Sequence, residues 1–293
     1  MAEALQFDAP TPLGYFASLV ADDASLLLIE AAASIAQDED PTLDIQAVLA
    51  QLDLLAHRLK RRIPADAAPV QRLRLLNHYF FQVLGFSGNV NHYHDPNNSY
   101  LHSVLKTRRG IPITLSLIYI ELAVQIGLKA SGVSFPGHFL VKLRMPNGDS
   151  QGEVVIDPFT GSSLSRDRLD DMLRPYLRRL DSSADFELPL GRFLQAAPPR
   201  EVLARMLRNL KQIHRSTHDW PRLLAVQQRL VVLLPTAWEE RRDRGLALAE
   251  LARFPEALAD LDAYLDHDPN ADDHAAVRQR AGELRQAGRP RLH

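Results

Sequence analysis

The stretch RRGIPITLSLIYIELAVQIGL, residues 108–128, restricts the possible folds of this chain more than any other part of its sequence. Pro112 suits the first position of a helix and Gly127 the position just past its end, so the segment predicts a helix of about fourteen residues. Apolar side chains lie on nearly every face of that helix. Because a helix with this pattern is buried within a domain, the rest of the chain must build a core around it.

Short β-rich segments follow the predicted helix. They are KASGVSF (129–135), HFLVKLRM (138–145) and EVVIDPF (153–159). The turn signal PNGD (146–149) lies between the last two segments and predicts a β-hairpin there. A helix followed by antiparallel strands indicates an α+β fold and not a doubly wound parallel sheet.

Further helices are predicted before this region. Residues 12–35 form an alanine-rich run with apolar residues, and apolar residues recur at three- and four-residue spacing over 42–60. With a third apolar segment at 69–84, they predict three helices. Residues 86–100 are rich in Gly, Asn and Pro and are predicted to form a loop.

From residue 201 onward the chain is predicted to be helical, and the sequence repeats. Trp220-Pro221 recurs as Phe254-Pro255, an offset of 34 residues. This is the period of the tetratricopeptide repeat (TPR), in which each unit is a pair of helices. The pattern predicts two units and a capping helix, at residues 204–237, 238–271 and 274–287.

Composition excludes several classes of protein. Apolar residues make up 46% of the chain and charged residues 24%, as in ordinary globular proteins. The net charge of −2 gives no overall positive field, and two short basic clusters lack interleaved aromatic residues, so nucleic-acid binding is not expected. The sequence shows no signal peptide and no long apolar run, so we expect a soluble cytoplasmic protein without membrane contact.

Several motifs together resemble a known family: LNHYFFQVLGFSGN, DPNNSYLHSVLKTRRGIPITLSLIY, FPGHFLVK and IDPFTG. They resemble the transglutaminase-like core of the bacterial SirB-type family, in which this core precedes TPR repeats. The resemblance covers most of the chain. It implies an α+β, transglutaminase-like (papain-like) core with a helical N-terminal cap at 1–182, a linker at 183–200, and an all-α TPR-like solenoid fragment at 201–293.

The resemblance also implies a site. In transglutaminase-like enzymes a cysteine begins the central helix, where the helix dipole and a histidine lower the pKa of its thiol, and an aspartate orients the histidine. His138 and Asp157 match the histidine and aspartate positions, and the cysteine position falls on Pro112. Proline cannot be a nucleophile, and the chain has no cysteine. We therefore expect a noncatalytic protein, a pseudoenzyme, that acts as a protein-interaction or regulatory module.

The alternative is a hydrolase or acyltransferase that uses a hydroxyl nucleophile with His138 and Asp157. Thr114 is rotated by about 200° from Pro112 around the helix and would point away from the histidine. Ser116 is rotated by only about 40° from Pro112 around the helix, but it lies about one turn, ~6 Å, further along the helix axis. A hydroxyl also needs the histidine within hydrogen-bond reach of its oxygen, since a helix dipole alone cannot remove its proton. Without such a base, His138 and Asp157 are a buried pair or part of a ligand pocket.

A metal site is a further possibility, because one loop carries His92, His94, Asp95 and His102. Their spacing does not match a helical metal motif, and ordinary turn hydrogen bonds are favoured. The resemblance places this loop against the core, which implies that Asn89, Asn98 and Ser99 support the start of the buried helix at Gly110. We expect no metal and no cofactor.

The predicted partner is a protein or peptide bound in the TPR-like groove. The inner helices carry a basic stripe that could hold an acidic peptide, or these helices could pack on the core domain instead. Both interpretations stay open from the sequence. The stripe consists of Arg205, Arg208, Asn209, Lys211, Gln212, Arg241, Arg242 and Arg244.

Overall fold

The computed structural model describes residues 10–147, 150–180 and 189–287. Its described residues group into two compact units. We call residues 28–36, 43–147, 150–180 and 189–206 the core unit, and residues 10–27, 37–42 and 207–287 the repeat unit. The division at 182 and 201 expected from the sequence stays a prediction.

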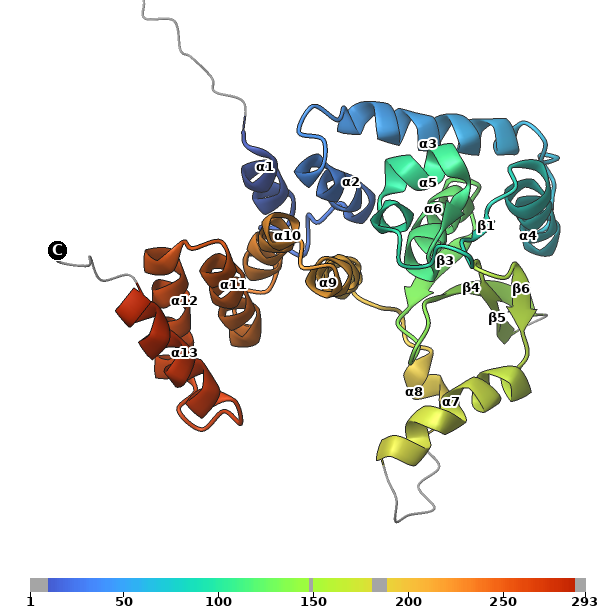
Figure 1. Cartoon of the computed structure of the whole chain (residues 1–293). Helices are drawn as coiled ribbons and strands as arrows, with labels where there is room; N and C mark the ends of the chain where they lie inside the picture. Colours follow the sequence, from blue (N-terminus) through green and yellow to red (C-terminus); the bar gives the residue numbers. More distant parts are fainter. Residues whose placement is uncertain (1–9, 148–149, 181–188, 288–293) are drawn as a thin grey trace, which may run out of the picture. The chain divides into compact units, whose positions relative to one another are not determined.

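The core unit combines helices with a small sheet (Figure 1). Its helices are α2 (Leu28–Ser34), α3 (Ile45–Lys60), α4 (Pro69–Asn77), α5 (Leu101–Thr107), α6 (Pro112–Gln125), α7 (Arg166–Leu180) and α8 (Leu190–Phe193). The antiparallel strands β3 (Lys129–Val133), β4 (Leu140–Asn147), β5 (Ser150–Asp157) and β6 (Ser162–Leu164) form one sheet in that order. Short β1 (Ser87–Gly88) and β2 (Arg109–Gly110) pair in parallel. This arrangement confirms the α+β fold.

Helix α6 is the buried centre of the core unit, as the sequence predicts. It has 14 residues, and Leu115, Ile118 and Leu122 are each 0% exposed. Gly127 follows with φ of +82°, a left-handed conformation that favours glycine. The helix packs against strands β3 and β4. The apolar pattern of residues 108–128 therefore predicted both the element and its burial.

The predicted continuous helix over residues 12–35 is wrong. Helix α1 (Pro12–Leu19) ends early, and α2 begins only at Leu28. Between them the carboxylate of Asp22 accepts hydrogen bonds from the backbone N–H of Ala24 (3.3 Å) and from Ser25 Oγ (3.3 Å). A short polar side chain that binds nearby backbone competes with helix formation, which explains the break.

The predicted helix over residues 69–84 is an α-helix in its first part and a π-helix in its second. Helix α4 ends at Asn77, and residues His78–Val83 form one turn of π-helix. Within it Phe80 is 0% exposed and stacks on Phe86 with ring centroids 4.4 Å apart. Residues 86–100 are largely loop, with β1 and the 3₁₀ turn Pro96–Ser99 inside.

The predicted hairpin is present, since β4 and β5 pair antiparallel with Asn147 opposite Ser150. Residues 148–149 of the PNGD turn lie outside the described residues, as do residues 181–188 of the expected linker. The later part of that linker joins the core unit. Leu190 and Leu194 pack in one apolar cluster with Val133 and Phe135, and Ala197 N–H donates to the Gly132 carbonyl (2.9 Å).

The repeat unit contains helix α1 and a stack of helix pairs. Helix α9 (Pro199–Ser216) leads into it and is followed by α10 (Trp220–Leu233), α11 (Trp238–Glu250), α12 (Phe254–His267) and α13 (His274–Ala287). Helices α10 and α12 begin at the repeated aromatic-proline pairs, and α13 coincides with the expected capping helix. These bounds confirm the helical repeat.

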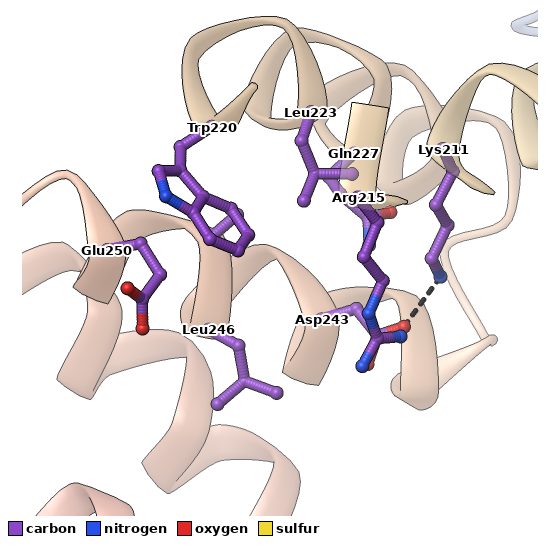
Figure 2. A pocket seen from close by; sticks show the side chains of 9 residues that line it. Lys211, Arg215, Trp220, Leu223, Gln227, Asp243, Leu246 and Glu250 are labelled. Atoms are coloured by element: carbon purple, nitrogen blue, oxygen red, sulfur yellow. Dashed lines mark ion pairs between the residues drawn. The ribbon is translucent and has the colours of Figure 1, made fainter. Parts of the chain in front are cut away.

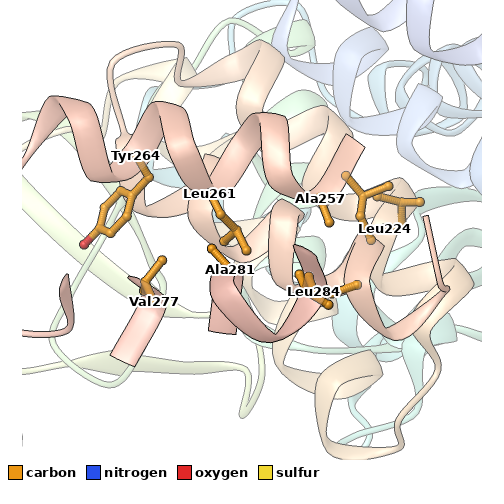
Figure 3. Packing of buried hydrophobic residues seen from close by; sticks show 9 residues of the cluster. Leu224, Ala257, Leu261, Tyr264, Val277, Ala281 and Leu284 are labelled. Atoms are coloured by element: carbon orange, nitrogen blue, oxygen red, sulfur yellow. The ribbon is translucent and has the colours of Figure 1, made fainter. Parts of the chain in front are cut away.

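Backbone geometry repeats at the same offset of 34 residues. His218 and Ala252, in the turns before α10 and α12, both have φ of +56°. Gly245 allows α11 to approach α12 closely, since an added Cβ would lie 3.0 Å from the Leu261 side chain. An apolar cluster that includes Leu261, Ala281 and Leu284 joins α11, α12 and α13 (Figure 3). The repeat is thus visible in both conformation and packing.

Candidate functional site

Strand register brings His138 and Asp157 together. Asp157 is the last residue of β5, and Ile156 before it pairs with Val141 of β4. His138 lies just before β4, in a turn where its N–H donates to the Phe135 carbonyl (3.0 Å) and where Gly137 has φ of +69°. The sequence predicted a strand that begins at residue 138, but β4 begins at Leu140. The histidine is therefore held by the turn that precedes this strand.

The two side chains are in contact. His138 Nε2 lies 2.9 Å from Asp157 Oδ1, with side chains 20% and 7% exposed. The aspartate is held further by its own loop. Oδ1 accepts from the Phe159 N–H (2.9 Å), and Oδ2 accepts from Thr160 Oγ1 (2.9 Å). A loop that binds both carboxylate oxygens fixes the orientation in which the aspartate meets the imidazole.

Asp157 is held in its charged form. Burial raises the pKa of a carboxyl group, but His138, the Phe159 N–H and the Thr160 hydroxyl all lower it, and the pKa of Asp157 falls below its ordinary value. The contact with His138 and the two hydrogen bonds from the loop thus outweigh the desolvation of the carboxylate. A charged aspartate next to a histidine can orient that imidazole and stabilise its protonated form.

The lowered pKa of Asp157 predicts a pH dependence of stability. Because this pKa is lower in the folded than in the unfolded protein, the stabilising contribution of Asp157 is complete above the unfolded value, about pH 4, and is lost as the pH falls through the folded value. The difference in free energy of unfolding between wild type and Asp157→Asn should therefore narrow on acidification. Denaturant titrations of both proteins at about pH 6 and about pH 3 measure it. A difference independent of pH would contradict the lowered pKa.

Hydrogen bonds connect this pair to the start of α6. Gly88 N–H donates to the Phe159 carbonyl (2.9 Å), and Gly88 pairs with Gly110 in the parallel β1–β2 contact. An added Cβ on Gly88 would lie 2.4 Å from the Phe159 ring, so the two segments touch. Since Gly110 is two residues before Pro112, the first residue of α6 lies on the segment that borders the Asp157 loop.

The asparagine loop supports the same helix start, as expected. Asn89 N–H donates to the Gly110 carbonyl (3.0 Å), and the Asn98 carbonyl accepts from the Ile111 N–H (3.4 Å). The two side chains bind each other, with Asn89 Nδ2 3.0 Å from Asn98 Oδ1. Asn98 and its neighbour Ser99 are buried, which fits a structural role for this part of the loop.

The two hydroxyl groups considered as nucleophiles are buried. Thr114 and Ser116 are each 0% exposed, and neither hydroxyl oxygen has a hydrogen-bond partner among the described residues. His138 therefore does not accept a hydrogen bond from either hydroxyl in this structure. A general base must be within hydrogen-bond reach of the proton it removes. Their assignment as nucleophiles stays a hypothesis without support from this geometry.

Three residues near His138 were not predicted as part of its site. Arg205 of α9 donates from Nη1 to Ser134 Oγ (2.7 Å) and to the Phe135 carbonyl (3.4 Å), in the turn that carries the histidine. The Tyr176 hydroxyl lies against Gly137, where an added Cβ would be 1.7 Å from it. Tyr93 contacts Phe159, with ring centroids 5.9 Å apart. Arg205 thus belongs to the core unit and not to a groove of the repeats.

The histidine loop makes ordinary turn contacts. The Asn98 amide donates to the His92 carbonyl (2.6 Å), and the His102 ring lies 3.1 Å from Ser103 Oγ. His94 packs edge-on against Tyr93. Within residues 10–147, 150–180 and 189–287, no group of three or more acidic or histidine side chains could hold a metal ion.

The basic stripe of the repeats is largely paired inside the repeat unit. Glu240, only 2% exposed, accepts from Arg208 (2.8 Å) and Lys211 (2.5 Å). Arg244 binds Asp260 through two hydrogen bonds, at 2.6 and 2.7 Å. These cations are already neutralised by acidic side chains of neighbouring helices. The stripe is therefore not an open clamp for an acidic peptide.

A cavity of about 210 Å³ lies among α9, α10 and α11 (Figure 2). Trp220, Leu223 and Leu246 supply apolar surface. Lys211 at its wall is paired with Asp243 (2.6 Å), whereas Arg215 makes no ion pair with any residue that the structure describes. The cavity therefore offers an apolar pocket whose edge carries Arg215, which has no ion-pair partner among the described residues, and Glu250, which is paired with Arg280 (3.0 Å).

Comparison with known proteins agrees with the fold. The transglutaminase-like superfamily matches residues 46–208, and a tetratricopeptide repeat family matches residues 210–282. The chain is thus a transglutaminase-like protein with TPR repeats. It belongs to the UPF0162 family, the SirB-type family expected from the motifs.

UPF0162 relatives align with this chain over most of their length. A UPF0162 protein of Xylella fastidiosa is 38% identical over 88% of this chain and 89% of its own length. A UPF0162 protein of Pseudomonas aeruginosa is 29% identical over 88% of this chain and 90% of its own length. Mouse F-box only protein 21 is 42% identical over 72 residues, or 25% of this chain and 12% of its own. No solved structure matches. Among the described residues, no helix has the length and apolarity needed to cross a membrane.

Proposed function

We propose that this chain is a noncatalytic, cytoplasmic binding protein, a transglutaminase-like pseudoenzyme with a protein or peptide partner. The observation that carries the proposal is Pro112 at the first position of α6. There the family resemblance requires the attacking thiol. The side chain of proline is a saturated ring, which can neither give up a proton nor attack a carbonyl.

The surroundings of Pro112 support the same conclusion. The hydroxyls of Thr114 and Ser116 are fully buried and unpartnered among the described residues. His138 and Asp157 keep the contact that would orient a general base. A base without a nucleophile can still bind a ligand through its imidazole. We infer that the pair now serves binding or stability.

The second candidate function is hydrolysis or acyl transfer with a hydroxyl nucleophile. It is favoured by one observation, the charged Asp157 next to His138. Such a reaction needs the Ser116 or Thr114 oxygen to reach the imidazole. Because both residues are 0% exposed, α6 would have to move for substrate to enter.

The partner is proposed to bind at the repeat-unit cavity. Trp220 and Leu246 form an apolar pocket, and Arg215 adds an unpaired positive charge beside it. An extended segment with an apolar side chain next to an acidic one complements both features. We expect the apolar side chain to enter the pocket and the acidic one to bind Arg215.

Capture experiments with the full-length protein test this proposal. Wild type is expected to retain a partner from an extract of the cells that make it, and both Trp220→Ala and Arg215→Glu should lose that same partner. Arg278→Glu is the matched control, because Arg278 is exposed on α13 and does not line the cavity. Retention of the partner by both cavity variants would contradict binding at this place.

A further inference from the structure

We propose that Arg205, Tyr93 and Tyr176 form, next to His138, a binding site for a carboxylate that has an aromatic or apolar group beside it. This inference deepens the proposed function and rests on it, since it specifies the ligand that the core unit would bind without turnover.

The first observation is that Arg205 has no acidic partner. Both of its hydrogen bonds, to Ser134 Oγ (2.7 Å) and the Phe135 carbonyl (3.4 Å), use Nη1. No carboxylate among the described residues pairs with this guanidinium. Its Nε and Nη2 groups, which form the two-donor edge that matches a carboxylate, make no protein hydrogen bond in the described structure.

The guanidinium is held in place before any ligand arrives. It lies over the Phe139 ring at 5.6 Å from the centroid, and Nη1 is anchored to the 134–135 turn. Burial lowers the pKa of Arg205, while Tyr93 and Tyr176 nearby raise it. A partly desolvated arginine interacts with an anion more strongly than one in bulk water. The Nε–Nη2 edge of Arg205 is therefore held in a fixed orientation and has no carboxylate partner among the described residues.

The neighbouring groups are hydrogen-bond donors as well. The hydroxyls of Tyr93 and Tyr176 make no hydrogen bond with described residues, and both phenols lie near enough to Arg205 to affect its pKa. Tyr176 places its hydroxyl at Gly137, next to His138. Phe135 joins the two sides of the site, because its carbonyl accepts from the His138 N–H (3.0 Å) as well as from Arg205. Several donors without a dedicated acceptor favour an oxyanion ligand.

The aromatic rings define the rest of the ligand. Phe159 lies 6.5 Å from His138 and 5.9 Å from Tyr93, centroid to centroid, and Tyr93 is 39% exposed. These rings give apolar surface beside the charged fork. A carboxylate attached to an aromatic or aliphatic group fits this combination better than a small inorganic anion. The source could be a chain end or an acidic side chain.

Binding of small probes to the full-length protein tests the inference. N-acetylphenylalanine supplies a chain-end carboxylate, N-acetylglutamate α-amide a side-chain carboxylate, and N-acetylphenylalanine amide has none. We expect one of the two acids to bind at millimolar concentration and to shift the NMR signal of the Arg205 Nε–H. The amide should bind at least about tenfold more weakly, which equals about 1.4 kcal/mol. The acid that binds more tightly identifies the source.

Variants assign the effect to Arg205. Arg205→Met and Arg205→Lys should each weaken the binding of that acid about tenfold or more, since lysine keeps the charge but loses the fork. Arg208→Met is the matched control on the same helix, because Arg208 is engaged with Glu240, and it should bind as the wild type does. Thermal unfolding of each variant shows that it is folded.

Three outcomes would overturn the proposal: no binding of either acid at millimolar concentration, equal binding of acid and amide, or tighter binding of phenyl phosphate. Each differs from a failure of the proposed function, which would appear as a covalent adduct on α6. A protein that forms such an adduct and still binds the acid through Arg205 would retain this site but not the noncatalytic role.

Discussion

Replacing Asp38 by alanine is expected to lower the free energy of unfolding of the repeat unit by about 3–5 kcal/mol. Arg229 of α10 has a side chain that is 0% exposed, and it meets Asp38 through two hydrogen bonds of 2.6 and 2.8 Å. Without the carboxylate, the described residues would leave this buried guanidinium only the Phe16 ring, at 4.9 Å. An unpaired buried charge is far more costly than a lost surface contact.

The measurement is denaturant unfolding followed by tryptophan fluorescence. Both tryptophans of the chain, Trp220 and Trp238, lie in the repeat unit, so the signal reports that unit. Glu39→Ala is the matched control at the next residue, since its partner Arg222 is 54% exposed and such a pair contributes about 0–1 kcal/mol. The double variant Asp38→Leu/Arg229→Met should be less destabilised than Asp38→Ala. Equal losses for Asp38→Ala and Glu39→Ala would contradict the prediction.

Phe80→Ala is expected to have a comparable effect on the core unit, again about 3–5 kcal/mol. Phe80 is fully buried in the π-helical turn, stacked on Phe86 and edge-on to Tyr119 of α6 at 5.2 Å. Its removal leaves a cavity against the central helix. Hydrogen exchange of α6 peptides, measured by mass spectrometry, should accelerate, and the logarithm of the exchange rate should rise in proportion to the lost free energy.

The same turn offers a control for Phe80→Ala. Val83 is 45% exposed, and Val83→Ala should change stability by no more than about 0.5 kcal/mol. If both variants showed the same exchange rates in α6, Phe80 would not be the contact that holds the π-helical turn to that helix.

The elements that the sequence predicted well have a strong periodic signal. Helix α6 is apolar on nearly every face, and the 34-residue offset marks the starts of α10 and α12. The elements that it predicted poorly depend on local competition. Asp22 forms a turn after α1 through its own side chain, and the π-helical turn after Asn77 has the same apolar spacing as an α-helix. Periodicity alone cannot resolve either effect.

The residues of the candidate site also differ in how well the sequence predicted them. His138 and Asp157 were found through their motifs, and strand register brings them into contact. Tyr93, Tyr176 and Arg205 carry no motif, and they meet the 134–138 turn and the Asp157 loop from three separate segments. Arg205 was assigned to the repeat stripe because it lies on a helix that continues into the repeats. Only the folded arrangement shows that its guanidinium faces the turn of His138.

A noncatalytic role requires that no side chain of α6 act as a nucleophile, and covalent labelling can test this requirement. The full-length protein is treated with a fluorophosphonate and, separately, with an activated acyl ester, and the peptide that contains residues 112–125 is analysed by mass spectrometry. We expect an unmodified peptide in the wild type and in His138→Ala alike. An adduct on Ser116 or Thr114 that forms in the wild type and disappears in His138→Ala would show instead that the chain is an enzyme.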